Sequence, residues 1–434
     1  MYKKKVCIFG QGFVGLPLAL SFALRGYYSV GVDVDEKLVD KINRGETSLK
    51  EKYKGKNIQQ ILKQELKKKS YVAVKDAEKA VKNCNNIIVT VGLPINQGSV
   101  IMSALEEACI VIGKNLKKQD LIIIRSTVIP GTTEEFIKPI LEKESGLKAG
   151  VDFYLGYASE RIAEGNAFDE FENMPTLVGA VNDVSLNKAV ELLGVVCKAE
   201  IISAPGIKEV ETAKLFENIQ RDVNIALCQE FARFTEALGV DIFGVVKLAN
   251  THSRVNLLIP GSGVGGYCIP NAYHYLAGKG KELGLSMELL KLARENNAKL
   301  PEYIVKKTEE MLLQKGKELK GSKVGVLGLA MKDYSNDDRV SPPVDICRKL
   351  IERGAVVQAF DPAVSGEYEF KVKTQEEAVI GTDAVLILAK QQGICFQEVE
   401  NMIMKMNNPP VCIDVKAAMQ KELIINQGIK YWRI

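Results

Sequence analysis

The sequence has little histidine, and its charges nearly cancel. His252 and His274 are its only histidines, which excludes a histidine-rich zinc site and leaves few imidazoles for base catalysis. Its 58 lysines and arginines against 54 acidic residues give a net charge of +4, too little for a dedicated nucleic-acid binder. No apolar run reaches the roughly 18 residues that a membrane helix needs. We therefore expect no metal site, and neither nucleic acid nor a membrane as a partner.

Paired cysteine motifs are also missing. The nine cysteines are scattered, odd in number and form no C-x-x-C motif, which is typical of reduced thiols. The apolar stretch after the first lysines ends in glycines within a few residues, without the cleavage pattern of a signal peptide. These observations predict a cytoplasmic protein.

Apolar patterning divides the 434 residues into three parts. Short strand-like runs separated by helical patterns occur at 5–9, 29–33, 86–92 and 120–125. A helical period dominates 207–239 and 282–316, the second being interrupted at Pro301. Strand patterns return at 323–330, 356–361, 384–389 and 411–415. We predict an α/β protein with two Rossmann-like, doubly wound parallel-sheet domains, at 1–200 and 303–434. A central helical domain with a long helix joins them at 201–302.

A glycine-rich motif follows the first predicted strand. Residues 10–15 are GQGFVG, in which Gly10 permits a tight turn, Gly12 lets backbone approach a pyrophosphate, and Gly15 lets helix and strand pack closely. Asp33 lies at the end of the second strand, where a carboxylate accepts ribose hydroxyls and repels a 2′-phosphate. The motif predicts NAD rather than NADP. A later run, GVLGLA at 325–330, has no comparable acid at matched spacing.

Cys268 ends a second glycine-rich stretch, PGSGVGGYCIP at 260–270. Such a stretch lets backbone pass close to a ligand, and a thiolate there can act as a nucleophile. From spacing alone, Cys268 is either catalytic or a buried structural thiol. Lys214 and Asn218 lie four residues apart, hence on one face of a helix. Lys214 is either a desolvated site lysine or a lysine whose stem covers apolar surface.

Residues 50–69 contain eight lysines and two glutamates. A solvated helix and loop is the simpler interpretation, and a phosphate-binding patch is the alternative. The segment lacks the interleaved aromatic residues that nucleic-acid surfaces use.

Six motifs then occur in order: GQGFVG at 10–15, RSTVIPGTT at 125–133, SERIAEGNA at 159–167, KLFENIQRDVNIAL at 214–227, HSRVNLLIPGSGVGGYCIP at 252–270 and GLAMKDYSNDDRVSP at 328–342. Together they resemble the UDP-glucose/GDP-mannose dehydrogenase family over nearly the whole chain. SERIAEGNA is most similar to the UDP-N-acetylhexosamine branch. The resemblance implies that 1–200 bind NAD, 201–302 form a dimer core and 303–434 bind a UDP-sugar.

The resemblance also implies the reaction, an oxidation of a UDP-sugar primary alcohol to the uronic acid by two successive hydride transfers to NAD. Cys268 would form a thiohemiacetal and then a thioester. Lys214 and Asn218 would stabilise the oxyanion, Glu160 would position or deprotonate water, and Thr127 would help to order that water.

The family pattern further implies two sets of binding residues. Cofactor residues are Gly10, Gln11, Gly12, Phe13, Val14, Gly15, Asp33, Thr127 and Arg339. Substrate residues are Glu160, Arg161, Lys214, Asn218, Arg254, Gly261, Gly265 and Lys332. Arg254 would reach the neighbouring site in a homodimer.

Three segments depart from that pattern. Ala272 stands where the family usually has an aspartate four residues after the nucleophile. Leu93 precedes Pro94 where a threonine is usual, and 50–56 lack the expected Glu-Pro-Gly. The segment NAYHYL at 271–276 is unusual throughout. The missing aspartate leaves the hydrolysis step to Glu160 or His274.

Three alternatives stay open at this point. The chain is a UDP-glucose dehydrogenase, or a diverged member that performs only a two-electron oxidation, or a protein that binds NAD and UDP-sugar without turnover. The number of NADH molecules formed per sugar separates them.

Overall fold

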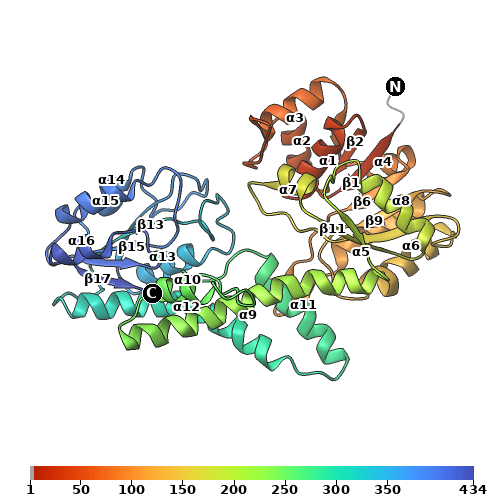
Figure 1. Cartoon of the computed structure of the whole chain (residues 1–434). Helices are drawn as coiled ribbons and strands as arrows, with labels where there is room; N and C mark the ends of the chain where they lie inside the picture. The colour runs from red at the N-terminus through yellow and green to blue at the C-terminus, as the bar shows by residue number, and fades with distance from the viewer. Residues whose placement is uncertain (1–3) are drawn as a thin grey trace. The chain divides into compact units, whose positions relative to one another are not determined.

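Apolar runs in the first part of the chain form one eight-stranded sheet in the order β12-β11-β10-β9-β6-β1-β2-β5 (Figure 1). The computed structural model describes residues 4–434. The strands are β1 (Lys5–Phe9), β2 (Tyr28–Val32), β5 (Tyr71–Val74), β6 (Asn86–Val89), β9 (Leu121–Ile124), β10 (Tyr154–Ala158), β11 (Thr176–Ala180) and β12 (Ile201–Ser203). Neighbours are parallel except β10 and β11. The predicted parallel arrangement is thus confirmed, with one antiparallel pair.

Helices accompany this sheet, which explains why its strands are continuously apolar. Val6 and Ile8 belong to a core shared with α1 and α7, while Cys7 between them is also buried. The helices are α1 (Gly15–Leu24), α2 (Glu36–Asn43), α3 (Ile58–Lys67), α4 (Ala77–Asn83), α5 (Ser103–Asn115), α6 (Lys138–Ser145), α7 (Ala167–Asn173) and α8 (Asp183–Leu193), with a π-helical turn, η1 (Thr132–Ile137). The loops contain two short antiparallel hairpins. One pairs β3 (Lys52–Tyr53) with β4 (Lys56–Asn57), and the other pairs β7 (Ile95–Asn96) with β8 (Ser99–Val100).

Four helices make up the predicted helical part of the chain. They are α9 (Ile207–Leu238), α10 (Ile242–Ala249), α11 (Cys268–Glu282) and α12 (Glu288–Leu313). The expected break at Pro301 is wrong, because α12 continues through it. Proline in a helix loses one hydrogen bond, and here the buried ring of Pro301 is retained among packed neighbours such as Leu300 and Ile304.

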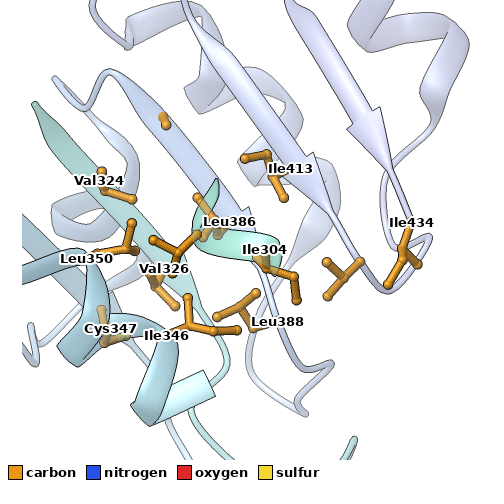
Figure 2. Packing of buried hydrophobic residues seen from close by; sticks show 14 of the residues in the cluster. Ile304, Val324, Val326, Ile346, Cys347, Leu350, Leu386, Leu388, Ile413 and Ile434 are labelled. Atoms are coloured by element: carbon orange, nitrogen blue, oxygen red, sulfur yellow. The ribbon is translucent and has the colours of Figure 1, made fainter. Parts of the chain in front are cut away.

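A five-stranded parallel sheet closes the chain, in the order β14-β13-β15-β16-β17. Its elements are β13 (Lys323–Leu327), α13 (Pro342–Glu352), β14 (Val356–Phe360), α14 (Gln375–Val379), β15 (Ala384–Ile387), α15 (Phe396–Met402), η2 (Ile403–Lys405), β16 (Val411–Asp414), α16 (Lys421–Asn426) and β17 (Lys430–Arg433). Figure 2 shows Ile304 of α12 among Val326, Leu386 and Ile413 of the strands. The second Rossmann-like sheet is therefore confirmed.

The chain forms two compact units. One comprises residues up to Glu217 together with His274–Leu285, and the other comprises Asn218–Tyr273 and Ser286–Ile434. Both α9 and α11 thus contain a boundary between units. The three-domain boundaries stay a prediction. Within residues 4–434, no helix is both long and apolar enough to cross a bilayer.

Candidate functional site

The glycine turn between β1 and α1 has the shape of a dinucleotide cradle. Gly10 has a φ of +83°, which a residue with a side chain rarely adopts. A Cβ on Gly15 would lie 1.7 Å from the carbonyl oxygen of Gly10, so only glycine fits there. A Cβ on Gly12 would meet nothing within 4 Å, which leaves open space beside the backbone. The first turn of α1 has no acidic residue and no side-chain cap. These residues fit a bound pyrophosphate.

Asp33 follows β2 and faces the same turn. Its Oδ2 accepts a 2.7 Å hydrogen bond from the backbone N–H of Gln11, and its Oδ1 accepts one of 3.0 Å from Asp35. The side chain of Gln11 is buried and bonds to Ile8 and Tyr71. Of the predicted cofactor residues, Gln11 can therefore offer only its backbone atoms to the cofactor. Phe13 and Val14, which follow in the same turn, are half-buried.

Glu160 is held by three donors. Its Oε2 lies 2.5 Å from Nε of Arg125, and both side chains are more than nine-tenths buried. Its Oε1 accepts from the backbone N–H groups of Arg161 at 2.7 Å and Ile162 at 2.8 Å. In this conformation the carboxylate shapes its own loop with three hydrogen bonds, and one of its roughly four acceptor sites is left for water. Arg161, the next predicted residue, pairs with Glu217 of α9.

Two further carboxylates shape the site loops, and sequence analysis missed both. Glu51 is 1% exposed and accepts 2.7 Å hydrogen bonds from the N–H groups of Gly165 and Ala167, at the end of the SERIAEGNA loop. The sequence feature that could have pointed to Glu51 is its position as one of two glutamates among eight lysines at 50–69. That segment contributes a buried anchor in addition to its solvated lysines.

Glu211 of α9 holds the loop that follows Thr127. It is fully buried and accepts hydrogen bonds from the N–H groups of Gly131 at 2.6 Å and Thr133 at 3.0 Å. Burial raises the pKa of Glu211, although these hydrogen bonds oppose the shift. Thr127 itself is half-buried. Lys214, one helical turn after Glu211, is 9% exposed.

Asn218 and Cys268 meet in the second unit. Nδ2 of Asn218 donates a 3.3 Å hydrogen bond to the backbone carbonyl of Cys268. Cys268 is the first residue of α11, and its side chain is exposed. The positive end of the helix favours negative charge at that position. Of the two interpretations of Cys268, the buried structural thiol is wrong.

The glycines before Cys268 are packed against the loop at 331–342. A Cβ on Gly265 would lie 2.6 Å from the carbonyl oxygen of Val340, and one on Gly266 would lie 2.6 Å from the sulfur of Met331. These two glycines therefore permit contact between two loops of the protein. Gly261 lies beside Lys416, whose Nζ would be 3.3 Å from an added Cβ. Sequence analysis missed Lys416, which lies two residues after the buried end of β16.

Arg339 is fixed beside the glycine-rich stretch that precedes Cys268, where the N–H of Gly266 donates to its backbone carbonyl at 3.2 Å. It forms a two-pronged ion pair with Asp337, at 2.8 and 2.6 Å, and its guanidinium lies 5.5 Å from the ring centre of Tyr267. Lys332 is exposed. Arg254 is exposed and bonds to His252 on the loop after α10.

Ala272, which stands where the family usually has an aspartate, is buried. Ala272 is 0% exposed on α11, so a carboxylate there would be buried. Asn271 beside it is half-buried. Within residues 4–434, no group of three or more histidine, cysteine or acidic side chains is placed to bind a metal ion.

The second sheet has its own acidic residue after all. Asp361 follows β14, and its Oδ2 accepts from the N–H groups of Leu329 at 2.8 Å and Ala330 at 3.2 Å. The long loop at 331–341 lengthens the segment between β13 and β14, so Asp361 lies farther in sequence from the glycines at 325–328 than Asp33 lies from Gly10. Asp361 is 2% exposed and fully engaged by the protein, unlike Asp33.

A dinucleotide cradle on one sheet, a second Rossmann-like sheet and an exposed thiol at a helix start define a nucleotide-dependent dehydrogenase. Sequence profiles agree with this class. The UDP-glucose/GDP-mannose dehydrogenase family matches with its NAD binding domain at 4–196, its central domain at 208–299 and its UDP binding domain at 325–421. The chain belongs to this family and is an NAD-dependent nucleotide-sugar dehydrogenase.

Two relatives and one solved structure illustrate the similarity. The UDP-N-acetyl-D-mannosamine dehydrogenase of Pyrococcus horikoshii is 33% identical over 386 residues, 88% of each chain. The UDP-N-acetyl-D-glucosamine 6-dehydrogenase of Pseudomonas aeruginosa is 35% identical over 369 residues, 84% of each. The solved structure of the P. horikoshii UDP-D-ManNAc dehydrogenase covers 99% of both chains, with a TM-score of 0.89 at 30% identity.

Proposed function

We propose that the protein oxidises a UDP-N-acetylhexosamine at its primary alcohol to the uronic acid. The observation that carries this proposal is the placement of Cys268, an exposed thiol on the first turn of α11 with Asn218 bonded to its backbone. The names of the relatives support the sugar, since both act on UDP-N-acetylhexosamines.

The chemistry proceeds in two oxidations. The alcohol carbon would lose a hydride and the hydroxyl a proton, which gives the aldehyde, and NAD, when bound, would supply the hydride acceptor for each oxidation. The thiolate of Cys268 would add to the aldehyde carbon and form a thiohemiacetal, so the aldehyde is not released. Loss of a second hydride from this adduct would give the thioester. Water then breaks the carbon–sulfur bond, which releases the carboxylate and restores the thiol.

The surrounding residues support the charged stages. Lys214 and Asn218 lie one turn apart on α9, and their N–H donors would stabilise the oxyanion. Glu160 would orient water with Thr127 through the acceptor site that its three present donors leave. Arg161, Arg254, Gly261, Gly265 and Lys332 would bind the UDP-sugar, and Arg339 would bind the cofactor by charge-assisted hydrogen bonds.

A homodimer would complete the site. One face of α9 in the second unit exposes Leu227, Phe231, Phe234 and Leu238, spaced by four, three and four residues. A continuous apolar face on a long helix favours association with a second copy. Arg254 would then reach the neighbouring site. The nine unpaired cysteines favour a reducing compartment, the cytoplasm.

A panel of UDP-sugars with NADH counted per sugar tests the proposal. We expect two NADH per UDP-N-acetylhexosamine and weaker turnover of UDP-glucose. Preference for UDP-glucose would overturn the sugar assignment. One NADH per sugar would show that only the first oxidation proceeds, and binding without NADH would contradict an enzymatic role.

A further inference from the structure

Two segments that depart from the family pattern, 90–94 and 271–276, contact each other in the first unit. The hydroxyl of Tyr275, on α11, donates a 2.5 Å hydrogen bond to the backbone carbonyl of Leu93. Both residues are 4% exposed, so the bond is shielded from water. One residue earlier, His274 lies beside the β7–β8 turn, because a Cβ on Gly98 would lie 3.8 Å from its Nδ1. The helix α11 therefore contacts this loop through a buried hydrogen bond and beside its tip.

The start of the same loop is packed on the dinucleotide turn. Thr90 follows β6, and its hydroxyl donates to the carbonyl oxygens of Phe9 at 2.7 Å and Gly10 at 3.1 Å. A Cβ on Gly15 would lie 2.7 Å from that hydroxyl. Any shift of Thr90 would thus displace the turn, and the three residues after it lead directly to the bond with Tyr275.

The remainder of the loop is a tight hairpin. Gln97 and Gly98, at its tip, have φ values of +48° and +78°, as a type I′ turn requires. The N–H of Ile101 closes the base with a 2.9 Å hydrogen bond to the carbonyl of Pro94. The closed hairpin therefore begins one residue after Leu93, whose carbonyl accepts the bond from Tyr275.

We propose that Tyr275 is a positioning residue that couples the dinucleotide turn to the helix on which Cys268 lies. Tyr275 is about two turns after Cys268 on the continuous helix α11. Binding of the cofactor at the turn and the orientation of α11 favour one another, and this coupling is reciprocal. The inference rests on the proposed function, because it takes Cys268 to be the nucleophile.

Tyr275→Phe tests the coupling because it removes the hydroxyl and keeps the ring. The buried carbonyl of Leu93 then lacks its donor, and we expect KM for NAD to rise about tenfold while kcat changes much less. Tyr303→Phe is the matched control, since it removes a tyrosine hydroxyl bonded to Glu236 at 2.9 Å in the second unit. The control should leave KM for NAD unchanged.

Alkylation by iodoacetamide, followed peptide by peptide in the mass spectrometer, gives a second readout. Cys268 and Cys395 are the exposed cysteines, so Cys395 serves as an internal control. We expect NAD to change the alkylation rate of Cys268 several-fold in the wild type and not in Tyr275→Phe. Cys395 should not respond in either protein.

Two outcomes would overturn the proposal. One is a Tyr275→Phe enzyme with wild-type KM for NAD, and the other is an alkylation rate of Cys268 that responds to NAD as in the wild type. If the wild type reduces no NAD with any UDP-sugar, the proposed function fails. Titration with NADH, followed by its fluorescence, and the alkylation assay still test the coupling in that case, because neither needs a substrate.

Discussion

The carboxylate of Asp33 accepts a 2.7 Å hydrogen bond from the backbone N–H of Gln11, which joins the end of β2 to the dinucleotide turn. The carboxylate therefore supports the shape of the turn, in addition to the ribose contact that we propose for it. The two roles give one substitution two measurable effects.

Asp33→Ala should weaken NAD binding by about 10- to 100-fold, because it removes the ribose acceptor and one anchor of the turn. Equilibrium titration with NADH fluorescence measures the effect. Asp35→Ala is a suitable control, since Asp35 caps α2 by accepting from Lys37 and Leu38 and has no predicted cofactor role. Unchanged NADH affinity in Asp33→Ala would mean that Asp33 does not contact the cofactor.

Cys268→Ser should reduce uronic acid formation by about a thousandfold or more, because a serine hydroxyl is a far weaker nucleophile than a thiolate. Product analysis by mass spectrometry measures the acid. Cys395→Ser removes the other exposed thiol and should retain full activity. Normal acid formation by Cys268→Ser would exclude covalent catalysis.

Glu236 links α9 to the end of the chain and makes stability depend on pH. Its carboxylate accepts hydrogen bonds from Trp432 at 2.8 Å, Tyr303 at 2.9 Å and Lys307 at 3.0 Å. Burial opposes its ionisation, but the hydrogen bonds from Lys307, Trp432 and Tyr303 outweigh burial and lower the pKa of Glu236. A lowered carboxyl pKa stabilises the fold above the unfolded value of about 4.3, and this contribution disappears as the pH falls through the folded pKa.

Glu236→Gln should therefore cost about 2 kcal/mol near neutral pH and progressively less below about pH 4. Denaturant unfolding at several pH values measures the difference. Glu230→Gln, on the same helix and exposed, should show no such pH dependence. An equal loss at acidic and neutral pH would argue against an ionised Glu236.

Phe234→Glu should convert a dimer into monomers, because it places a charge in the middle of the exposed apolar face of α9, where Phe234 is 67% exposed. Analytical ultracentrifugation measures the assembly. Ile380→Glu introduces the same charge at another exposed apolar residue and should leave the assembly unchanged. If the wild type is monomeric at micromolar concentration, the dimer proposal is wrong.

Local patterns predicted much of the fold. The run before Gly10 is a strand, the residues after it form a helix, and α9 ends one residue before the predicted position. The patterns carry this information because strands such as β1 and β9 are buried on both faces and give continuous apolar runs, whereas an amphipathic helix buries one face and gives a helical period. The break at Pro301 was predicted wrongly, because tertiary packing holds α12 through the proline.

The sequence by itself determined the glycine turn, the acid after the second strand and eight of the strands, since each follows from the conformational limits or apolar pattern of a few adjacent residues. The sheet strands β5, β10, β11, β12 and β17 were not predicted. Only the tertiary structure decided that the carboxylate of Asp361 is hydrogen-bonded to the turn after β13. It also decided that Glu51 and Glu211 anchor distant loops and that Tyr275 bonds to Leu93. These contacts join segments 31 to 182 residues apart. Partners so far apart leave no periodic trace, because their approach depends on how whole elements pack.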